Sequence, residues 1–396
     1  MELTRDEGEL RDSLAKLAEK RPDAAAEPTK DEIRALHERQ RLARLAALNG
    51  SFDGVLKVLR ESLAQPRELS VDAISPQLVS VEPGSQEAQV FGAAALTWSV
   101  PVSQGFGRRL RFLVRDGSNG KLIGIIGLTD PVFNLRPRDA WVGWNAQGRK
   151  DRLVHVMDAF VLGGVPPYSR LLGGKLVALL AASQEVVRAF HRKYGESEGI
   201  ISKKKKNPRL VLLTTTSALG RSSLYNRLRI PNGVRFLTNM DKDRVPVWQT
   251  QGYGHFHVDE GMFRKMVEVL ARRNHPYASG NRFGDGPNWK IRVIRQAAVE
   301  LGVPEECVLH GIRRQVYVIP LATNTRAFLC GHSQAPEYKT TNVEDIAAFW
   351  KERWGRPRAQ RCPEWMDWQP DELLGHLSLL HSEATKAGER HDASQS

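Results

Sequence analysis

The 396 residues are enough for about two to three domains, and a composition of 41% hydrophobic and 26% charged residues is typical of globular proteins. The 58 lysine and arginine residues exceed the 45 aspartate and glutamate residues, so the net charge is +13. This surplus indicates a polyanionic partner, nucleic acid before an anionic membrane. The three cysteines, Cys307, Cys330 and Cys362, form no C-x-x-C pair, which excludes a disulfide scaffold and a cysteine-based zinc ribbon.

The start of the chain, MELTRDEGELRD, is acidic, and no apolar signal segment follows it. The most apolar stretch, residues 161–182, is interrupted by two prolines, Arg170 and Lys175, and is therefore not expected to span a membrane. We expect a protein of the reducing cytoplasm with no membrane partner.

Residues 1–75 are predicted to form an N-terminal helical module. Apolar residues recur there mostly three and four positions apart, with a break between residues 21 and 32. Thr29 stands at an N-cap position with Glu32 three residues later, which predicts a capping box. No catalytic pattern occurs here, so we interpret the module as a packing or partner-binding appendage.

Residues 76–235 have strand-like periodicity and are predicted to form an α/β core with a mixed sheet. Residues 110–115 and 121–128 are two strands joined by the turn DGSNG, which predicts a β-hairpin. The other elements predicted for this core are a strand at 155–162, a helix at 171–192, a strand at 209–216 and a helix at 217–229.

Residues 236–383 are predicted to form a C-terminal α+β extension, and residues 384–396 a disordered polar tail. Helices are expected at 260–273 and 288–301, the second ending at Gly302 as its C-cap residue. Short strands are expected at 245–251, 255–258, 315–321 and 327–330.

The turn SRLLGGK, residues 169–175, is a candidate anion site at a helix start, because backbone N–H groups bind anions there and glycines permit close approach. It resembles the pyrophosphate turn of GNAT acyltransferases, with Arg170, Gly173 and Lys175 at the motif positions and Gly174 between them. Lys175 replaces the small residue of that motif. The resemblance implies a GNAT-like core and acetyl-coenzyme A, whereas the residues alone leave the cofactor unknown. The alternative is that Gly173 and Gly174 only let the helix pack closely on the sheet.

Two residues are candidates for acid–base chemistry. By the same resemblance, Tyr225 falls where GNAT enzymes keep a general acid, a role that suits a hydroxyl still protonated at neutral pH. The alternative is a core residue beside Leu224 and Leu228. Asp158, within the predicted strand 155–162, is the nearest carboxylate that could act as a base, or else a carboxylate satisfied by the backbone or an arginine.

Residues 201–244 contain eleven lysine and arginine residues against two aspartates, a net charge of +9. Such clustering is typical of phosphate-backbone binding, although a lysine loop can also serve solubility alone. The candidate contacts are Lys203, Lys204, Lys205, Lys206, Arg221 and Arg227.

A second glycine-rich turn, residues 282–290, precedes a helix and offers Lys290 and Arg292 as further nucleic-acid contacts, with Trp289 able to stack on a base. Its alternative is an ordinary turn with a buried indole. The sequence HFHVD gives His255, His257 and Asp259 as weak metal-ligand candidates, because alternate residues of a strand share one face. Structural or phosphate-contacting histidines are the preferred interpretation.

Long segments of the chain resemble the DruA family of Druantia anti-phage proteins over roughly residues 90–331. They are RRLRFLVRDGSNGKLIGIIGLTDPVFNLRPRDAWVGW, VMDAFVLGGVPPYSRLLGGKLVALL, LLTTTSALGRSSLYNRL, FGDGPNWKIRVIRQA and HGIRRQVYVIPLA. The resemblance implies a bacterial anti-phage or mobile-element setting and other defence-system proteins as partners. The first hypothesis is a defence component that binds nucleic acid, with DNA preferred over RNA. The alternatives are an acyltransferase acting on a nucleic acid or a protein amine, and a non-catalytic adaptor for a larger effector.

Overall fold

The computed structural model describes residues 3–19, 28–196, 207–231, 233–238, 248–250, 258–280, 287–304 and 310–393. The chain divides into two compact units, which are treated separately below. The helical unit comprises residues 1–41, 218–221 and 249–314; the sheet unit comprises residues 42–217, 222–248 and 315–396. The predicted division into four segments at residues 76, 236 and 384 stays a prediction.

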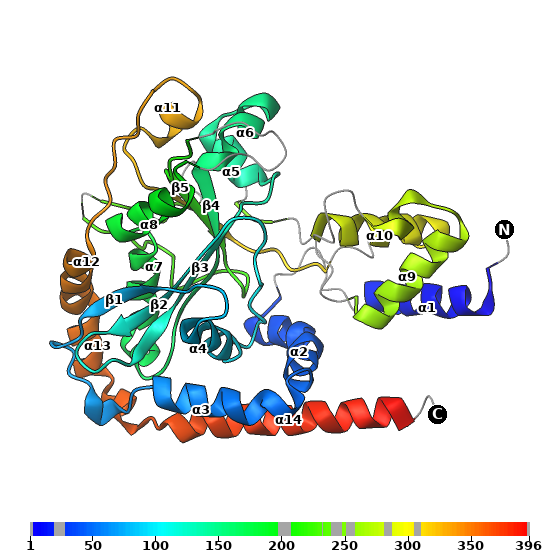
Figure 1. The fold of residues 1–396 in the computed structure, drawn as a ribbon, viewed down its shortest axis with the longest axis horizontal. Helices are drawn as coiled ribbons and strands as arrows, with labels where there is room; N and C mark the ends of the chain where they lie inside the picture. The colour runs from blue at the N-terminus through cyan, green and yellow to red at the C-terminus, as the bar shows by residue number, and fades with distance from the viewer. Residues whose placement is uncertain are drawn as a thin grey trace. The chain divides into compact units, whose positions relative to one another are not determined.

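Within the described residues, the sheet unit is built on one mixed sheet of six strands, which lie in the order in which they follow along the chain. Figure 1 labels β1 to β5 of this sheet. Only β4 and β5 pair in parallel, and every other neighbouring pair is antiparallel. This confirms an α/β protein with a mixed sheet and the predicted hairpin. The strands are β1 (Pro76–Ser80), β2 (Arg109–Asp116), β3 (Leu122–Thr129), β4 (Val156–Gly164), β5 (Leu212–Thr216) and β6 (Val316–Pro320).

One face of the sheet is covered by α7 (Gly173–Leu180), α8 (Gln184–Tyr194) and α12 (Val343–Trp350). Helix α7 packs on β3 and β4, because nearly all of its side chains are apolar and buried. The single helix predicted over residues 171–192 is wrong. Two helices replace it, since the buried Ser183 leaves helical geometry and its hydroxyl accepts a hydrogen bond from the Val186 N–H as the N-cap of α8.

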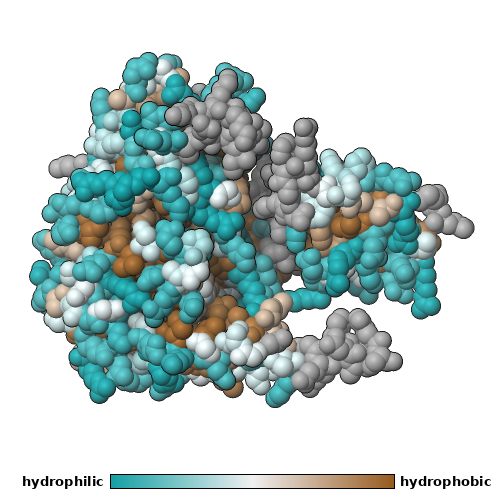
Figure 2. Space-filling model, in the orientation of Figure 1, coloured by the Kyte–Doolittle hydropathy of each residue, from teal (hydrophilic) through white to brown (hydrophobic). Residues whose placement is uncertain are grey.

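The opposite face of β1 to β3 is covered by α4 (Gln86–Ala95). Helix α3 (Phe52–Ser62) packs on α4, and the long α14 (Pro370–Ala393) packs on α3. Figure 2 shows a mostly hydrophilic surface with hydrophobic side chains gathered around α4. The predicted disordered tail from residue 384 differs from the structure, in which α14 continues to Ala393. Ala384 extends the apolar face of Leu377 and Leu380 by one helical turn and is buried.

The part of this face over β4 to β6 is covered by α5 (Arg136–Val142) and α11 (Thr325–Leu329), with the exposed α6 (Ala146–Arg152) beyond α5. The predicted strand at 327–330 is wrong, because those residues belong to α11 and its end. Short apolar runs carry too little periodicity to separate helix from strand. The Thr325 hydroxyl bonds to the backbone of Ala322 and so fixes the turn that starts α11.

Residues 217–229 form turns and not the predicted helix. Gly220 and Arg227 adopt left-handed backbone angles, with φ of 72° and 60°, and a right-handed helix cannot pass through them. The predicted strands 245–251 and 255–258 lie largely outside the described residues. The last short helix of the sheet unit is α13 (Arg356–Arg361).

The helical unit contains α1 (Arg5–Glu19), α9 (Glu260–Arg272), α10 (Pro287–Glu300) and most of α2 (Lys30–Ala46). The predicted capping box is confirmed: the Thr29 N–H donates to Glu32 at 2.7 Å and the Glu32 N–H donates to the Thr29 hydroxyl at 3.2 Å. The two predicted helices are also confirmed, and Gly302 follows α10 with φ of 65°. In the ranges described, no helix is both long and apolar enough to cross a bilayer.

Candidate functional site

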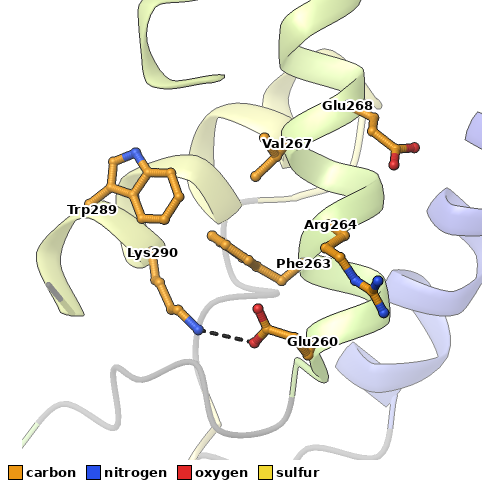
Figure 3. A pocket seen from close by; sticks show the side chains of 7 residues that line it. All are labelled: Glu260, Phe263, Arg264, Val267, Glu268, Trp289 and Lys290. Atoms are coloured by element: carbon orange, nitrogen blue, oxygen red, sulfur yellow. Dashed lines mark hydrogen bonds and ion pairs between the residues drawn. The ribbon is translucent and has the colours of Figure 1, made fainter. Parts of the chain in front are cut away.

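Lys290 and Arg292 lie on α10 of the helical unit. Lys290 lines a pocket of about 500 Å³ between α9 and α10 (Figure 3). The Lys290 ammonium bonds to Glu260 at 3.1 Å and lies 4.9 Å from the centre of the Phe263 ring. Trp289 is buried, packs edge-on against Phe263 and donates its indole N–H to the Tyr277 carbonyl. The indole is thus used in the core of this unit, whereas Arg292 is exposed.

Of the metal candidates, His255 and His257 lie outside the described residues. Asp259 is the N-cap of α9: it accepts a hydrogen bond from the Met262 N–H at 2.8 Å and pairs with Arg39 at 2.7 Å. Within the part of the chain that the structure describes, no cluster of three His, Cys, Asp or Glu side chains is placed to hold a metal ion.

The turn that precedes α7 brings Arg170, Gly173, Gly174 and Lys175 together at the start of that helix. A Cβ atom on Gly173 would stand 2.6 Å from the Tyr168 carbonyl oxygen, and one on Gly164 of β4 would stand 2.9 Å from the Gly174 nitrogen. Such distances are well inside van der Waals contact, so these glycines are required for α7 to approach the turn and the end of β4.

The two basic side chains of this turn, Arg170 and Lys175, contact other parts of the sheet unit. Lys175 donates to the carbonyl oxygens of Leu224 at 2.8 Å and Ser223 at 3.4 Å, and burial lowers the pKa of its ammonium group. Arg170 pairs with Glu372 at 3.2 Å. Because a Cβ on Gly174 would also meet Leu224 at 3.0 Å, the segment 222–225 lies directly over the start of α7.

Tyr225 is buried in the core that α7 shares with the sheet. Its ring stacks on Phe236 and packs edge-on against Tyr317, and its hydroxyl donates to the Leu162 carbonyl at 3.3 Å. Burial raises the pKa of this hydroxyl well above its ordinary value. The β4–β5 pairing ends at Ala159 and Thr215, so Tyr225 supplies a donor to a β4 carbonyl beyond the ladder.

Asp158 is the third residue of β4, opposite Thr129 of β3 and Thr214 of β5. It accepts a short hydrogen bond of 2.6 Å from the Thr214 hydroxyl. Burial raises its pKa to about 6, although the Thr214 hydrogen bond and the Arg138 guanidinium both act in the opposite direction. A carboxyl group with this pKa can exchange a proton near neutral pH, which is what a general base requires.

The two acid–base candidates lie on opposite faces of the sheet. Met157 and Ala159, the strand neighbours of Asp158, point into the core that contains Tyr225. Successive side chains of a strand alternate between faces, so Asp158 points away from that core. The structure therefore does not combine Tyr225 and Asp158 in one site.

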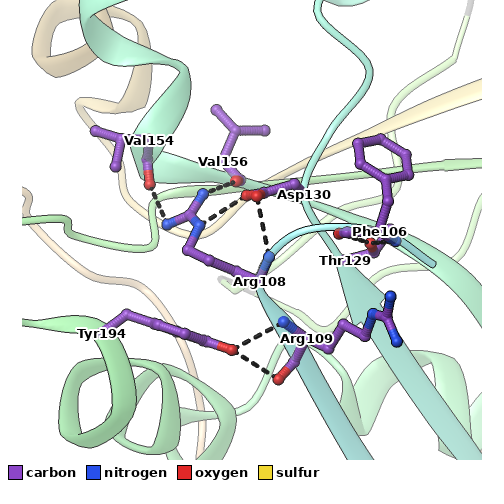
Figure 4. Close-up of polar contacts among 8 residues, drawn as sticks. All are labelled: Phe106, Arg108, Arg109, Thr129, Asp130, Val154, Val156 and Tyr194. Atoms are coloured by element: carbon purple, nitrogen blue, oxygen red, sulfur yellow. Dashed lines mark hydrogen bonds and ion pairs between the residues drawn. The ribbon is translucent and has the colours of Figure 1, made fainter. Parts of the chain in front are cut away.

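The strand ends around Asp158 are fixed by a group of polar contacts (Figure 4). Arg108 donates to Asp130 at 2.7 Å and to the carbonyl oxygens of Val154 and Val156, which joins the start of β2 to the end of β3 and the start of β4. The Tyr194 hydroxyl both accepts from the Arg109 N–H and donates to the Arg109 carbonyl, at 2.8 Å each. Asp158 is thus held on a rigid frame.

The segment 131–152, between β3 and β4, is a polar cluster that the sequence analysis did not identify. The Asp139 carboxylate bonds to Arg138, Arg149 and the Trp144 indole, and it borders an open pocket of about 500 Å³. The repeated arginines and tryptophans of RPRDAWVGW, residues 136–144, were the available signal.

The lysine run 203–206 lies outside the described residues. Arg221, in the helical unit, is exposed, and Arg227 is exposed in the sheet unit at the start of a short hairpin. We call residues 227–231 with 233–236 the arginine hairpin, because Arg229 and Arg235 lie directly opposite each other in its antiparallel bridge. Both of these arginines are exposed.

Comparison with known proteins gives a consistent result. A family model described as Druantia protein DruA matches residues 27–331. The Druantia protein DruA of Escherichia coli (strain UMEA 4076-1) is 42% identical over 374 residues, which cover 93% of this chain and 91% of that protein. No solved structure matches the chain. The chain belongs to the DruA family of Druantia proteins.

Proposed function

We propose that this protein is a nucleic-acid-binding component of Druantia anti-phage defence, and that the arginine hairpin contacts the phosphate backbone. Membership of the DruA family supports the defence role. The net charge of +13 supports a polyanionic partner. The observation that carries the proposal is that Arg229 and Arg235 lie opposite each other in an antiparallel bridge.

The arginine hairpin is a firmly anchored element with a basic outer face. Leu228, Ile230, Val234 and Phe236 alternate with the arginines and are buried. The backbone closes through the Ile230 N–H to the Val234 carbonyl and the Phe236 N–H to the Leu228 carbonyl, each at 2.9 Å. Strand alternation then directs the arginines outward together.

Like charges opposite each other in an antiparallel pair destabilise it unless an anion lies between or near them. Among the described residues, no carboxylate forms an ion pair with Arg227, Arg229 or Arg235. Lys339 adds to this surface, since the pKa of its ammonium group is lowered by burial and also by the charge of Arg235. A phosphate backbone supplies the missing negative charge, and arginine binds phosphate through two parallel hydrogen bonds.

The test compares two doubly substituted proteins in DNA binding followed by fluorescence anisotropy over a series of salt concentrations. Arg229→Ala with Arg235→Ala should weaken binding and flatten the plot of log affinity against log salt by about 0.9 for each duplex phosphate that the protein no longer binds. The matched control is Arg60→Ala with Arg356→Ala, which removes the same charge from exposed arginines already paired with Asp371 and Asp72. Equal slopes for the two variants would refute the proposed role of the hairpin.

A second candidate function is acyl transfer, which the strand arrangement favours. Parallel strands β4 and β5 are joined through the glycine turn and α7, and their pairing ends before β4 does. This strand–turn–helix order supports a ligand site at the end of β4, and Asp158, with its pKa raised to about 6, is suited to be a base. Segment 222–225 argues against acyl transfer, because it lies over the start of α7, where the cofactor would have to bind.

Titration calorimetry with acetyl-coenzyme A separates the two functions. Acyl transfer predicts saturable binding at one site that weakens in Arg170→Ala. The absence of any binding heat at millimolar cofactor would contradict acyl transfer.

A further inference from the structure

We propose that the segment 131–152 is a base-stacking surface that binds unpaired bases of single-stranded nucleic acid, with Phe133 as the stacking ring. This inference rests on the proposed function and names the form of nucleic acid. Its starting point is the exposure of two neighbouring apolar side chains, Val132 at 44% and Phe133 at 47%.

The exposure of Phe133 is built into the fold. The Arg138 side chain is fully buried and donates one hydrogen bond of 2.8 Å to the Val132 carbonyl and another of 2.8 Å to the Phe133 carbonyl. A buried guanidinium therefore holds the backbone of this loop while both side chains stand in solvent. The fold thus presents the Phe133 ring to solvent on a fixed backbone, where it can be contacted by a ligand.

The Phe133 ring is already one layer of a stack. The Arg149 guanidinium lies 4.7 Å from the ring centre, and Asp139 holds that guanidinium in place at 3.2 Å. Asp139 also fixes the Trp144 indole, which donates its N–H at 3.0 Å. A planar cation on one face of the ring leaves the other face for a base, as in single-strand binding proteins that stack bases on aromatic and arginine planes.

The charges and the pocket beside the ring fit the same ligand. Arg136 and Lys150 are exposed, and within the described residues neither is paired with a carboxylate, so both are placed to contact phosphates. The neighbouring pocket of about 500 Å³ is in the size range of small-ligand sites. Asn134 lines it and offers both a donor and an acceptor to the edge of a base.

The geometry selects single strands because a duplex keeps the faces of its bases within its own stack. A ring that stands on a surface can stack only on a base that is free of that stack. Basic residues without aromatic contacts, as in the arginine hairpin, read phosphates in either form.

The experiment measures anisotropy of labelled DNA single strands, RNA single strands of the same sequence and the DNA duplex. Phe133→Ala should weaken single-strand binding roughly tenfold, the effect of one unstacked base, and leave duplex affinity unchanged. The matched control is Leu379→Ala, which truncates an exposed apolar side chain on α14, outside the segment 131–152, and should leave both affinities unchanged. Phe133→Tyr keeps a ring and should bind like the original protein, and circular dichroism verifies that each variant is folded.

The outcomes separate this inference from the proposed function. Equally weakened binding of single strand and duplex in Phe133→Ala, or an effect of the same size in Leu379→Ala, would overturn the stacking role while leaving phosphate binding intact. Single-strand binding unchanged by Phe133→Ala, with duplex binding still dependent on Arg229 and Arg235, would do the same. Failure of every nucleic acid to bind would overturn the proposed function itself.

Discussion

At the scale of single residues, Tyr225 is the clearest case in which a predicted role and an observed contact can be separated. Tyr225→Phe keeps the stacked contact with Phe236 and the edge-on contact with Tyr317 but removes the donor to the Leu162 carbonyl. We expect the free energy of unfolding to fall by about 1 kcal/mol, the usual net value of such a hydrogen bond. Urea unfolding measures it. An unchanged stability together with abolished acyl transfer would instead favour the general-acid role.

Asp158 gives a prediction about pH. Its pKa is raised from 3.8 to about 6, so the folded protein holds this proton more tightly than the unfolded chain. The protonated Asp158 therefore contributes its full stabilisation of the folded protein below pH 3.8, the pKa of the unfolded chain, and this contribution is lost as the pH rises through about 6. Asp158→Asn keeps an acceptor for Thr214 without the charge.

Relative to Asp158→Asn, the original protein should lose on the order of 2 to 3 kcal/mol of stability between about pH 4 and pH 7. Urea unfolding of both proteins across that range is the measurement. A difference between the two proteins that stays constant with pH would show that the carboxyl group titrates alike in the folded and unfolded chains.

The sequence indicated these residues but not their surroundings. A glycine pair after a strand indicates either close packing or an anion site. The contacts in the structure, of Gly173 with Tyr168 and of Lys175 with Leu224, indicate close packing. The second contact joins residues 49 positions apart, so a local sequence pattern could not indicate it. The exposed Phe133 could not be predicted, because the buried arginine that holds its loop has the composition of a surface residue.

At the scale of elements, a substitution at Gly173 tests whether α7 depends on close packing against the turn that precedes it. Gly173→Ala places a Cβ 2.6 Å from the Tyr168 carbonyl oxygen, so the helix start must shift. Overpacking of this kind costs about 1 to 3 kcal/mol, and we expect a lower melting temperature without any ligand present. Abolished acetyl-coenzyme A binding at full stability would indicate instead that the glycine serves a ligand.

Elements with strong local signals were predicted well. The DGSNG hairpin, the capping box at Thr29 and the helices around α9 and α10 each depend on neighbours in sequence. The errors fall where a single residue redirects the backbone. Ser183 divides one predicted helix into two, and Arg227 adopts a left-handed conformation that its type seldom takes.

At the scale of the whole molecule, composition gave the net charge but did not show which arginines are free to bind a polyanion. Many arginines are paired: Arg108 with Asp130, Arg138 with Asp139 and Arg273 with Glu7. Pairing depends on the fold, so the sequence could not separate these from the exposed arginines of the hairpin. The lysine run 203–206 lies outside the described residues and stays a prediction.

The most direct test of nucleic-acid binding is the affinity of the unaltered protein for duplex DNA over a series of salt concentrations. Contacts by Arg229, Arg235 and Lys339 predict a slope of log affinity against log salt of about −2.7 or steeper, since each duplex phosphate contact contributes about −0.9. A slope near zero, or no binding at low salt, would contradict the proposal that this protein binds the phosphate backbone.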